Sequence, residues 1–190
     1  MIAWWQPLLG VVAGWLLSQG TEVIRQRRRA RKNKTAISAE LRDINSSTKL
    51  IINETVEFIK TPQITKGVDL PTHNIVNQVF KTTFSDTLLE LTERERLILA
   101  RVHDAVDRIN SMFSTIRLSD VYLGTEDSIN EKLRKILIAT SAAYIDACKI
   151  NVLIEMFTGD GDIRDADSIE RVNRVAGEAA AQVRSLRGQA

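Results

Sequence analysis

Residues 37–58 read ISAELRDINSSTKLIINETVEF, and apolar or small side chains recur in this stretch at every third or fourth position. A 4-3-4-3 spacing places such side chains on one face of an α-helix, because a helix completes one turn in 3.6 residues. The stretch therefore predicts a long amphipathic helix that ends at Lys60, just before Pro62. The members of the stripe are Ile37, Leu41, Ile44, Thr48, Ile51, Thr55 and Phe58.

Three further segments carry apolar stripes of the same spacing, and each predicts another helix. They lie in residues 98–116, 129–157 and 172–186, and the second is the longest. Stripes this regular favour nearly antiparallel helices that pack like a coiled coil. Their members are Ile98, Val102, Ala105, Ile109, Met112 and Ile116; then Ile129, Leu133, Ile136, Thr140, Ala143, Ala147, Ile150, Ile154 and Phe157; and finally Val172, Ala176, Ala179, Val183 and Leu186.

Local signals predict where these helices begin and end. The motifs TERE at 92–95 and SINE at 128–131 match the capping box, in which the first and last side chains satisfy free backbone N–H groups. Thr72 is expected to cap a shorter helix that contains residues 76–84. Residues 61–73 contain two prolines and one glycine, and this composition predicts a linker.

The N-terminal stretch differs from the rest of the chain because no side chain from Met1 to Thr21 is charged. A helix of about 20 mostly apolar residues is long enough to cross a hydrocarbon core of roughly 30 Å. Trp4 and Trp5 stand where interfacial aromatic side chains are common, and Pro7 is tolerated in the first turns of a helix. The alternative is a buried helix of a soluble protein. The basic block that follows at once favours the membrane span.

The basic block gives the span a predicted orientation. Residues 1–34 carry a net charge of +6 and residues 35–190 carry −4, so the basicity of the chain is local. Lys and Arg stay on the cytoplasmic side of a membrane, and a cleaved signal peptide would carry its positive charge before the apolar stretch. We expect an uncleaved signal-anchor in the cell (inner) membrane, with the N-terminus outside. The members of the basic block are Arg25, Arg27, Arg28, Arg29, Arg31, Lys32 and Lys34.

Two kinds of contact are expected at this end of the chain. Gly10, Gly14 and Ser18 are spaced four residues apart, and small residues on one stripe let two membrane helices approach closely. The alternative is that glycine is simply common in membrane helices. The basic block is expected to contact anionic lipid headgroups. Nucleic-acid binding and nuclear localisation are the alternatives, and the block lacks interleaved aromatic side chains for base stacking.

Candidate catalytic and metal-binding residues are few. His103 stands beside Asp104 with Asp107 one turn later, but a zinc site needs three or four ligands and the only other histidine is His73. We expect His103 to be a solvated helix residue. The acidic segment 160–167 lacks the glycine and glutamate positions of a calcium-binding EF-hand. No enzymatic activity, cofactor or metal is therefore expected.

The expected fold class is all-α, with an N-terminal single transmembrane helix followed by a cytoplasmic bundle of long antiparallel helices. Strand alternation is missing, and the single cysteine, Cys148, excludes an internal disulfide. The expected divisions are a transmembrane signal-anchor helix at 1–21, a basic juxtamembrane segment and amphipathic helix at 22–60, a linker at 61–73, and a helical bundle at 74–190.

The sequence favours a membrane-anchored scaffold or interaction protein that acts by tethering and oligomerisation. Its expected partners are the anionic lipids of the membrane, a second copy of the chain and an unidentified protein, and no nucleic acid. The alternative is a membrane-perturbing effector, pore-forming or toxin-like, whose span oligomerises. The long bundle argues against that alternative, because a lytic peptide does not need one. A metal-dependent helical enzyme is the least favoured, because no Glu-x-x-His pair is present.

Overall fold

The computed structural model describes residues 6–60, 74–88, 90–114, 126–159 and 166–189. These residues contain five helices and no strand, which confirms the all-α prediction. The predicted linker, 61–73, lies outside the described residues. The helices are α1 (Gln6–Lys60), α2 (Gln78–Thr87), α3 (Glu93–Ser114), α5 (Glu126–Thr158) and α6 (Ala166–Gln189).

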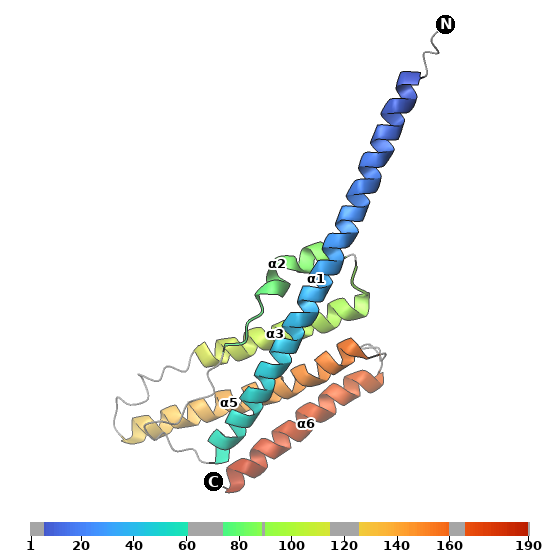
Figure 1. Cartoon of the computed structure of the whole chain (residues 1–190). Coiled ribbons are helices and arrows are strands. Elements are labelled where there is room, and N and C mark those ends of the chain that lie inside the picture. Colours follow the sequence, from blue (N-terminus) through green and yellow to red (C-terminus); the bar gives the residue numbers. More distant parts are fainter. Residues whose placement is uncertain (1–5, 61–73, 89, 115–125, 160–165, 190) are drawn as a thin grey trace.

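The helices form a bundle from which the first half of α1 projects (Figure 1). Successive long helices α3, α5 and α6 run in alternating directions, so the antiparallel arrangement of these neighbours is confirmed (Figure 1). Helix α5 is a central element, because it contacts α1, α3 and α6, and α1 likewise contacts α2, α5 and α6. The second half of α1 therefore belongs to the bundle, while its first half extends away from it.

The stripe predicted in residues 37–58 faces the core of the bundle, and this prediction is confirmed. Each of its seven members has an exposed fraction of 3% or less. Ile44 and Ile51, for example, share one core cluster with Val102 of α3 and Ile150 of α5. Burying an aliphatic side chain stabilises a protein by about 1.5–3 kcal/mol, so this seam is a main source of stability.

The other predicted stripes also face inward. Ile116 and the side chain of Ile129 lie outside the described residues, and the remaining members are buried or half-buried. A second, smaller cluster joins the end of α1 to α5 and α6 through Ile59, Tyr144, Ala179 and Val183. The buried members of the three stripes are Ile98, Val102, Ala105, Ile109, Ile136, Thr140, Ala143, Ala147, Ile150, Ile154, Ala179 and Val183.

Polar contacts across helices complete the packing. The hydroxyl of Thr48 donates to Oδ1 of Asn151 at 2.6 Å, which explains how a threonine fits in the apolar stripe of α1. Arg108 of α3 forms an ion pair with Asp146 of α5, with 3.0 Å between Nε and Oδ2. Because these contacts join different helices, they add directional constraints that apolar burial does not supply.

The predicted helix starts have mixed outcomes. At 92–95 the capping box is present, because the backbone N–H of Glu95 donates to Thr92 Oγ1 and the N–H of Thr92 donates to Glu95 Oε2. The second capping-box prediction is wrong, since Ser128 lies inside α5 rather than at its start. Helix α2 begins at Gln78, later than a cap at Thr72 predicts.

Replacing Thr92 with alanine is expected to lower the free energy of unfolding by about 1 kcal/mol, the usual cost of losing an N-cap side chain. Urea unfolding followed by far-UV circular dichroism measures the difference. Thr82→Ala is the matched control, because the exposed Thr82 hydroxyl donates to carbonyls of its own helix and, in the described part of the chain, to no other helix. Equal losses in the two variants would contradict a capping role for Thr92.

One helix within the described residues is long and apolar enough to cross a membrane, and it is Asn130–Thr158. Of its most apolar 18-residue window, 56% is buried inside the structure. This segment lies within α5, a central helix, so its apolar character follows from packing against three neighbours. The membrane span predicted at the N-terminus remains a prediction.

Candidate functional site

The projecting half of α1 exposes large apolar side chains over most of its circumference. Five large apolar side chains are exposed here, with exposed fractions from 51% for Val12 to 74% for Leu17. They are Val11, Val12, Trp15, Leu16 and Leu17. At 100° per residue these five positions cover about 240° of the helix circumference, and the small residues Gly10, Gly14 and Ser18 occupy the remaining arc. A helix with no charged face is typical of a segment that is surrounded by other apolar material.

The three small residues predicted to pack between spans also lie on this projecting part. Ser18 is exposed, and a Cβ atom added at Gly10 or Gly14 would meet nothing within 4 Å. Packing against the described residues therefore requires neither glycine. The structure places the three residues on one exposed stripe of α1.

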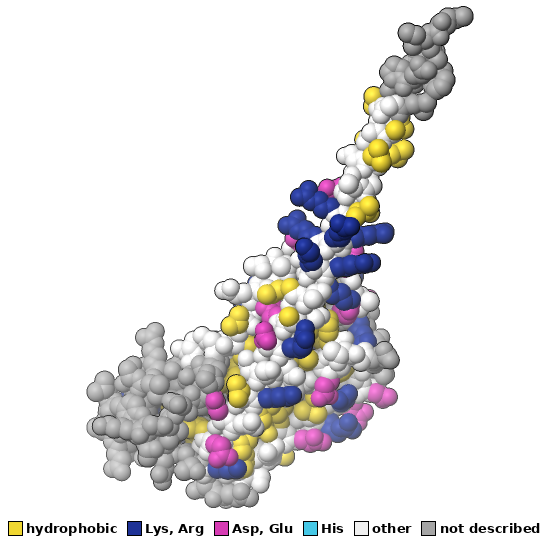
Figure 2. All heavy atoms as spheres, viewed as in Figure 1, with side chains coloured by type: hydrophobic (Ala, Val, Ile, Leu, Met, Phe, Trp, Pro, Cys, Tyr) yellow, Lys and Arg dark blue, Asp and Glu magenta, His cyan; other side chains and the backbone are white. Residues whose placement is uncertain are grey.

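The basic residues form a collar around α1 between its apolar projection and the bundle (Figure 2). Six of them are exposed: Arg25, Arg27, Arg28, Arg29, Arg31 and Lys32. The seventh, Lys34, is half-buried and forms an ion pair with Glu95 of α3 at 2.9 Å. Burial acts to raise the pKa of Glu95, but hydrogen bonds from Lys34 and Thr92 outweigh it and lower that pKa. Lys34 thus joins α1 to the bundle, and the other six remain accessible.

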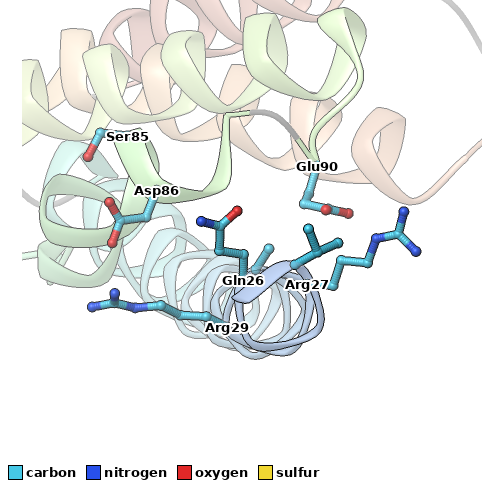
Figure 3. Close-up of a pocket in the computed structure, with 8 residues that line it drawn as sticks. Gln26, Arg27, Arg29, Ser85, Asp86 and Glu90 are labelled. Atoms are coloured by element: carbon cyan, nitrogen blue, oxygen red, sulfur yellow. The ribbon is translucent and has the colours of Figure 1, made fainter. Parts of the chain in front are cut away.

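An open groove of about 460 Å³ lies where the collar meets the bundle. One wall is α1, and the other is the end of α2 and the connection to α3. In Figure 3, Arg29 and Asp86 lie on one side of Gln26, and Arg27 and Glu90 lie on the other. The two walls therefore present opposite charges to each other. The lining residues are Val23, Gln26, Arg27, Arg29, Ala30, Ser85, Asp86 and Glu90.

The groove continues the core seam of α1 toward the N-terminus. Val23, Arg27, Ala30, Lys34 and Ile37 follow the same 4-3-4-3 spacing as the buried stripe. Ala30 and Ile37 are buried, whereas Val23 and Arg27 are exposed. At Arg27 a stripe position carries a cation in place of an apolar side chain, and there α1 no longer packs closely against the bundle.

A buried polar cluster lies deeper in the bundle, where Glu40 of α1 meets the first turn of α2. The backbone N–H of Val79 donates to Glu40 Oε1 at 2.7 Å, and that of Phe80 donates to Oε2 at 2.9 Å. The residue before the helix, Asn77, makes no capping bond with its side chain and donates instead to Asp107. Glu40 thus provides the anionic cap of α2 from another helix.

His103 of α3 is also part of this cluster, so the prediction that it is solvated is wrong. Its exposed fraction is 4%, and its ring stacks on Phe80 with 3.6 Å between centroids. Nε2 lies 3.8 Å from Glu40 Oε2, and neither ring nitrogen has a hydrogen-bond partner among the described residues. Burial lowers the pKa of His103 to about 4, Asp107 acts to raise it, and Lys81 acts to lower it.

Acidification from pH 7 to pH 5.5 is expected to lower the free energy of unfolding by about 1 kcal/mol through His103. The pKa of His103 is about 4 in the folded chain and 6.5 in the unfolded chain, so the unfolded chain takes up the proton first. This contribution is present above pH 6.5 and is lost as the pH falls toward 4. Burial also raises the pKa of Glu40, and this shift acts in the opposite direction, because the folded chain then holds that proton more tightly than the unfolded chain does. Urea titrations at several pH values measure the slope of the free energy of unfolding against pH.

The variant His103→Phe keeps the stacked ring and removes the titrating group, so its stability is expected to change less over the same interval. A slope unchanged by this substitution would assign the acid sensitivity to other groups. The slope, rather than the absolute stability, is the quantity to compare, because phenylalanine also changes the packing.

The described residues contain no group of three or more His, Cys, Asp or Glu side chains that could hold a metal ion. Residues 160–165, which form most of the acidic segment that does not match an EF-hand, lie outside the described residues. Glu40, Asp86 and Glu90 are site residues that the sequence patterns did not indicate. Glu40 directly precedes Leu41, a member of the apolar stripe. Its place in the sequence does not distinguish it from the other polar residues beside that stripe.

No protein-family model matches this chain. Comparisons with curated proteins and with solved structures returned no match either.

Proposed function

We propose that the chain is a single-pass membrane-anchored scaffold, whose bundle is held at the cytoplasmic face of the membrane and acts by tethering and oligomerisation. The observation that carries the proposal is the projecting half of α1. Its large apolar side chains are exposed over most of the helix circumference, and the remaining arc is uncharged. A hydrocarbon environment removes the free-energy cost of exposing this apolar surface to water.

The dimensions support a membrane span. The helical stretch from Gln6 to Ile24 contains 19 residues and carries one charge, at Glu22 near its end. At 1.5 Å per residue it measures about 28 Å, close to the thickness of a hydrocarbon core. Because α1 is continuous to Lys60, the span would pass directly into the core of the bundle.

The collar supports the orientation. Six exposed cations follow the apolar segment within two turns, and such clusters are retained on the cytoplasmic side and attracted to anionic headgroups. The bundle then lies in the cytoplasm, where its surface is available to a partner protein. This arrangement fits a protein that positions other molecules at the membrane.

Fractionation of cells that express the full chain tests the proposal. The wild-type chain is expected in the membrane pellet and to resist extraction with alkaline carbonate. Val12→Arg/Leu16→Arg is expected to move most of the protein to the supernatant, because each arginine near the centre of a span costs about 3 kcal/mol. Leu50→Arg is the matched control, since Leu50 is exposed on the bundle, and it is expected to stay in the pellet. Wild-type protein in the supernatant would refute the anchor.

Oligomerisation through the span is tested by the double variant Gly10→Leu/Gly14→Leu. We expect chemical crosslinking in membranes to give fewer dimers than the wild type, with membrane retention unchanged, because leucine keeps the helices apart. Leakage of a small dye from cells that express the wild type but not this variant would favour the alternative, a membrane-perturbing effector. Unchanged crosslinking would place the contact elsewhere.

A further inference from the structure

The face of α1 that points away from the bundle carries both the small residues of the projection and three cations of the collar. At 100° per residue, the positions of this outward stripe fall within about 80° of the helix circumference. The buried Ala30 and Ile37 lie on the opposite side of the helix. The stripe thus passes from small residues to cations without changing face. Its members are all exposed, and they are Gly10, Gly14, Ser18, Thr21, Arg25, Arg28 and Lys32.

The cations of the outward stripe have no counter-charge in the part of the chain that the structure describes. No ion pair or side-chain hydrogen bond joins Arg25, Arg28 or Lys32 to another described residue. Glu22 is the only acidic residue among the first 34, and it lies about a quarter of a turn from the centre of the stripe. Its carboxylate accepts a hydrogen bond from Gln26 at 3.4 Å. The positive charge of the stripe is therefore uncompensated.

An open hollow of about 510 Å³ lies among the side chains on this face, within the collar of cations (Figure 2). None of the described residues that line it is acidic. The hollow thus differs from the groove beside the bundle, where carboxylates stand opposite arginines. Its chemistry suits an anion. The lining residues are Thr21, Ile24, Arg25, Arg28, Arg29 and Lys32.

Two spans packed through their small residues would bring these cations together. This step rests on the function proposed above, in which the span is inserted and self-associates. The positive-inside rule gives every copy the same orientation, so a pair is parallel and like cations stand at the same depth. Helices that cross at about 40°, with axes about 8 Å apart at Gly14, are roughly 14–16 Å apart at Arg25 and Arg28. The pair would therefore contain a fork lined by four arginines.

The charge of this fork determines what can fill it. Its arginines repel one another, and this repulsion opposes the close approach that the small residues favour. A guanidinium binds phosphate through paired N–H donors, so a phosphate between arginines of two copies would replace repulsion by attraction. The fork begins where the apolar span ends, at the depth of the lipid headgroups. A choline headgroup would bring its own cation there, whereas an anionic headgroup would not.

We propose that anionic phospholipids bridge a parallel pair of chains, with their phosphates between Arg25 and Arg28 of one copy and the same residues of the second copy. Self-association through the span then depends on the charge of the lipid. It is weak in a neutral bilayer and strong in an anionic one. The bundle leaves room for the second copy, because the outward stripe is exposed as far as Lys32.

Disulfide crosslinking of the full chain in vesicles tests the proposal. The reporter chain carries Thr21→Cys, between the small residues and the cations of the outward stripe, and Cys148→Ala removes the native cysteine. The vesicles contain phosphatidylcholine alone, or phosphatidylcholine and phosphatidylglycerol at about 2:1, and we expect about fivefold more disulfide-linked dimer in the second. Val23→Cys in place of Thr21→Cys is expected to give little dimer in either, because Val23 lies on the opposite side of the helix.

Adding Arg25→Gln/Arg28→Gln to the reporter chain is expected to abolish the dependence on phosphatidylglycerol. The dimer should increase in phosphatidylcholine alone, because the repulsion is removed, and phosphatidylglycerol should add nothing further. Arg27→Gln/Arg31→Gln is the matched control, since it removes the same charge from the collar at positions outside the outward stripe. It is expected to keep the dependence.

Equal crosslinking of the reporter chain in the two lipids, or a dependence that survives Arg25→Gln/Arg28→Gln, would overturn the proposal. Inorganic phosphate that restores crosslinking in phosphatidylcholine vesicles would overturn the assignment to a lipid. Carbonate extraction of the same vesicles reports on the anchor, and Gly10→Leu/Gly14→Leu in the reporter chain reports on the pairing. The lipid dependence can therefore fail while the anchor and the pairing stand.

Discussion

Replacing Glu40 with alanine is expected to lower the free energy of unfolding by about 3–5 kcal/mol. The side chain is buried and accepts two backbone hydrogen bonds, from Val79 and Phe80, that form the only side-chain cap seen at the start of α2 in the described residues. Its removal leaves both N–H groups without partners and opens a space beside His103. Because hydrogen bonds to a charged group contribute more than neutral ones, the loss exceeds that of an ordinary cap.

Hydrogen exchange locates this effect, since the amides of Val79 and Phe80 are expected to lose protection before those of α3. Glu40→Gln keeps one acceptor oxygen and the size of the side chain, so we expect about half of the loss. Glu57→Ala is the control, because Glu57 is exposed on the same helix and its ion pair within the described residues is with Lys60, one turn later. A loss below 1 kcal/mol in Glu40→Ala would show that another group caps α2.

The second large effect is expected at Ile51, where substitution by alanine should cost about 3–4 kcal/mol. Ile51 has an exposed fraction of 0% and lies in the main core cluster together with residues of α3 and α5. The substitution removes three buried carbon atoms and leaves a cavity that the surrounding helices cannot fully close. Urea unfolding of the full chain in detergent measures the loss.

Leu50→Ala is a closely matched control for this experiment. Leu50 precedes Ile51 in α1 and has the same number of side-chain atoms, but its exposed fraction is 55%. We expect its substitution to cost less than 0.5 kcal/mol, because alanine is a strong helix former and little buried surface is lost. Similar costs at the two positions would mean that the seam of α1 does not face the bundle.

The contrast between Ile51 and Leu50 illustrates how far the sequence predicts the fold. A 4-3 spacing states which face of a helix is apolar, and the burial of Ile37, Ile44 and Ile51 agrees with it. The same rule holds along α3, α5 and α6, where the periodic positions lie inward. Periodicity is a local property, since side chains three or four residues apart share a face whatever the rest of the chain does.

The capping predictions show where local rules stop. Thr92 and Glu95 lie three residues apart, so their reciprocal bonds are decided by neighbouring sequence, and the predicted box is present. The cap of α2 comes from Glu40, 39 residues earlier than Val79 in the chain. No pattern near Gln78 signals it, because the partner is brought there only when α1 packs beside α2.

The sequence by itself determined the helical class, the inward faces of the helices, and an uncharged N-terminal stretch followed by a basic block. Those features depend on residues close together in the chain. Only the tertiary structure decided that His103 is buried against Phe80, that Glu40 caps α2, and that the seam of α1 opens into a charged groove. The physical reason is that an apolar stripe defines a face without defining its partner, and the partner is selected by packing among distant segments.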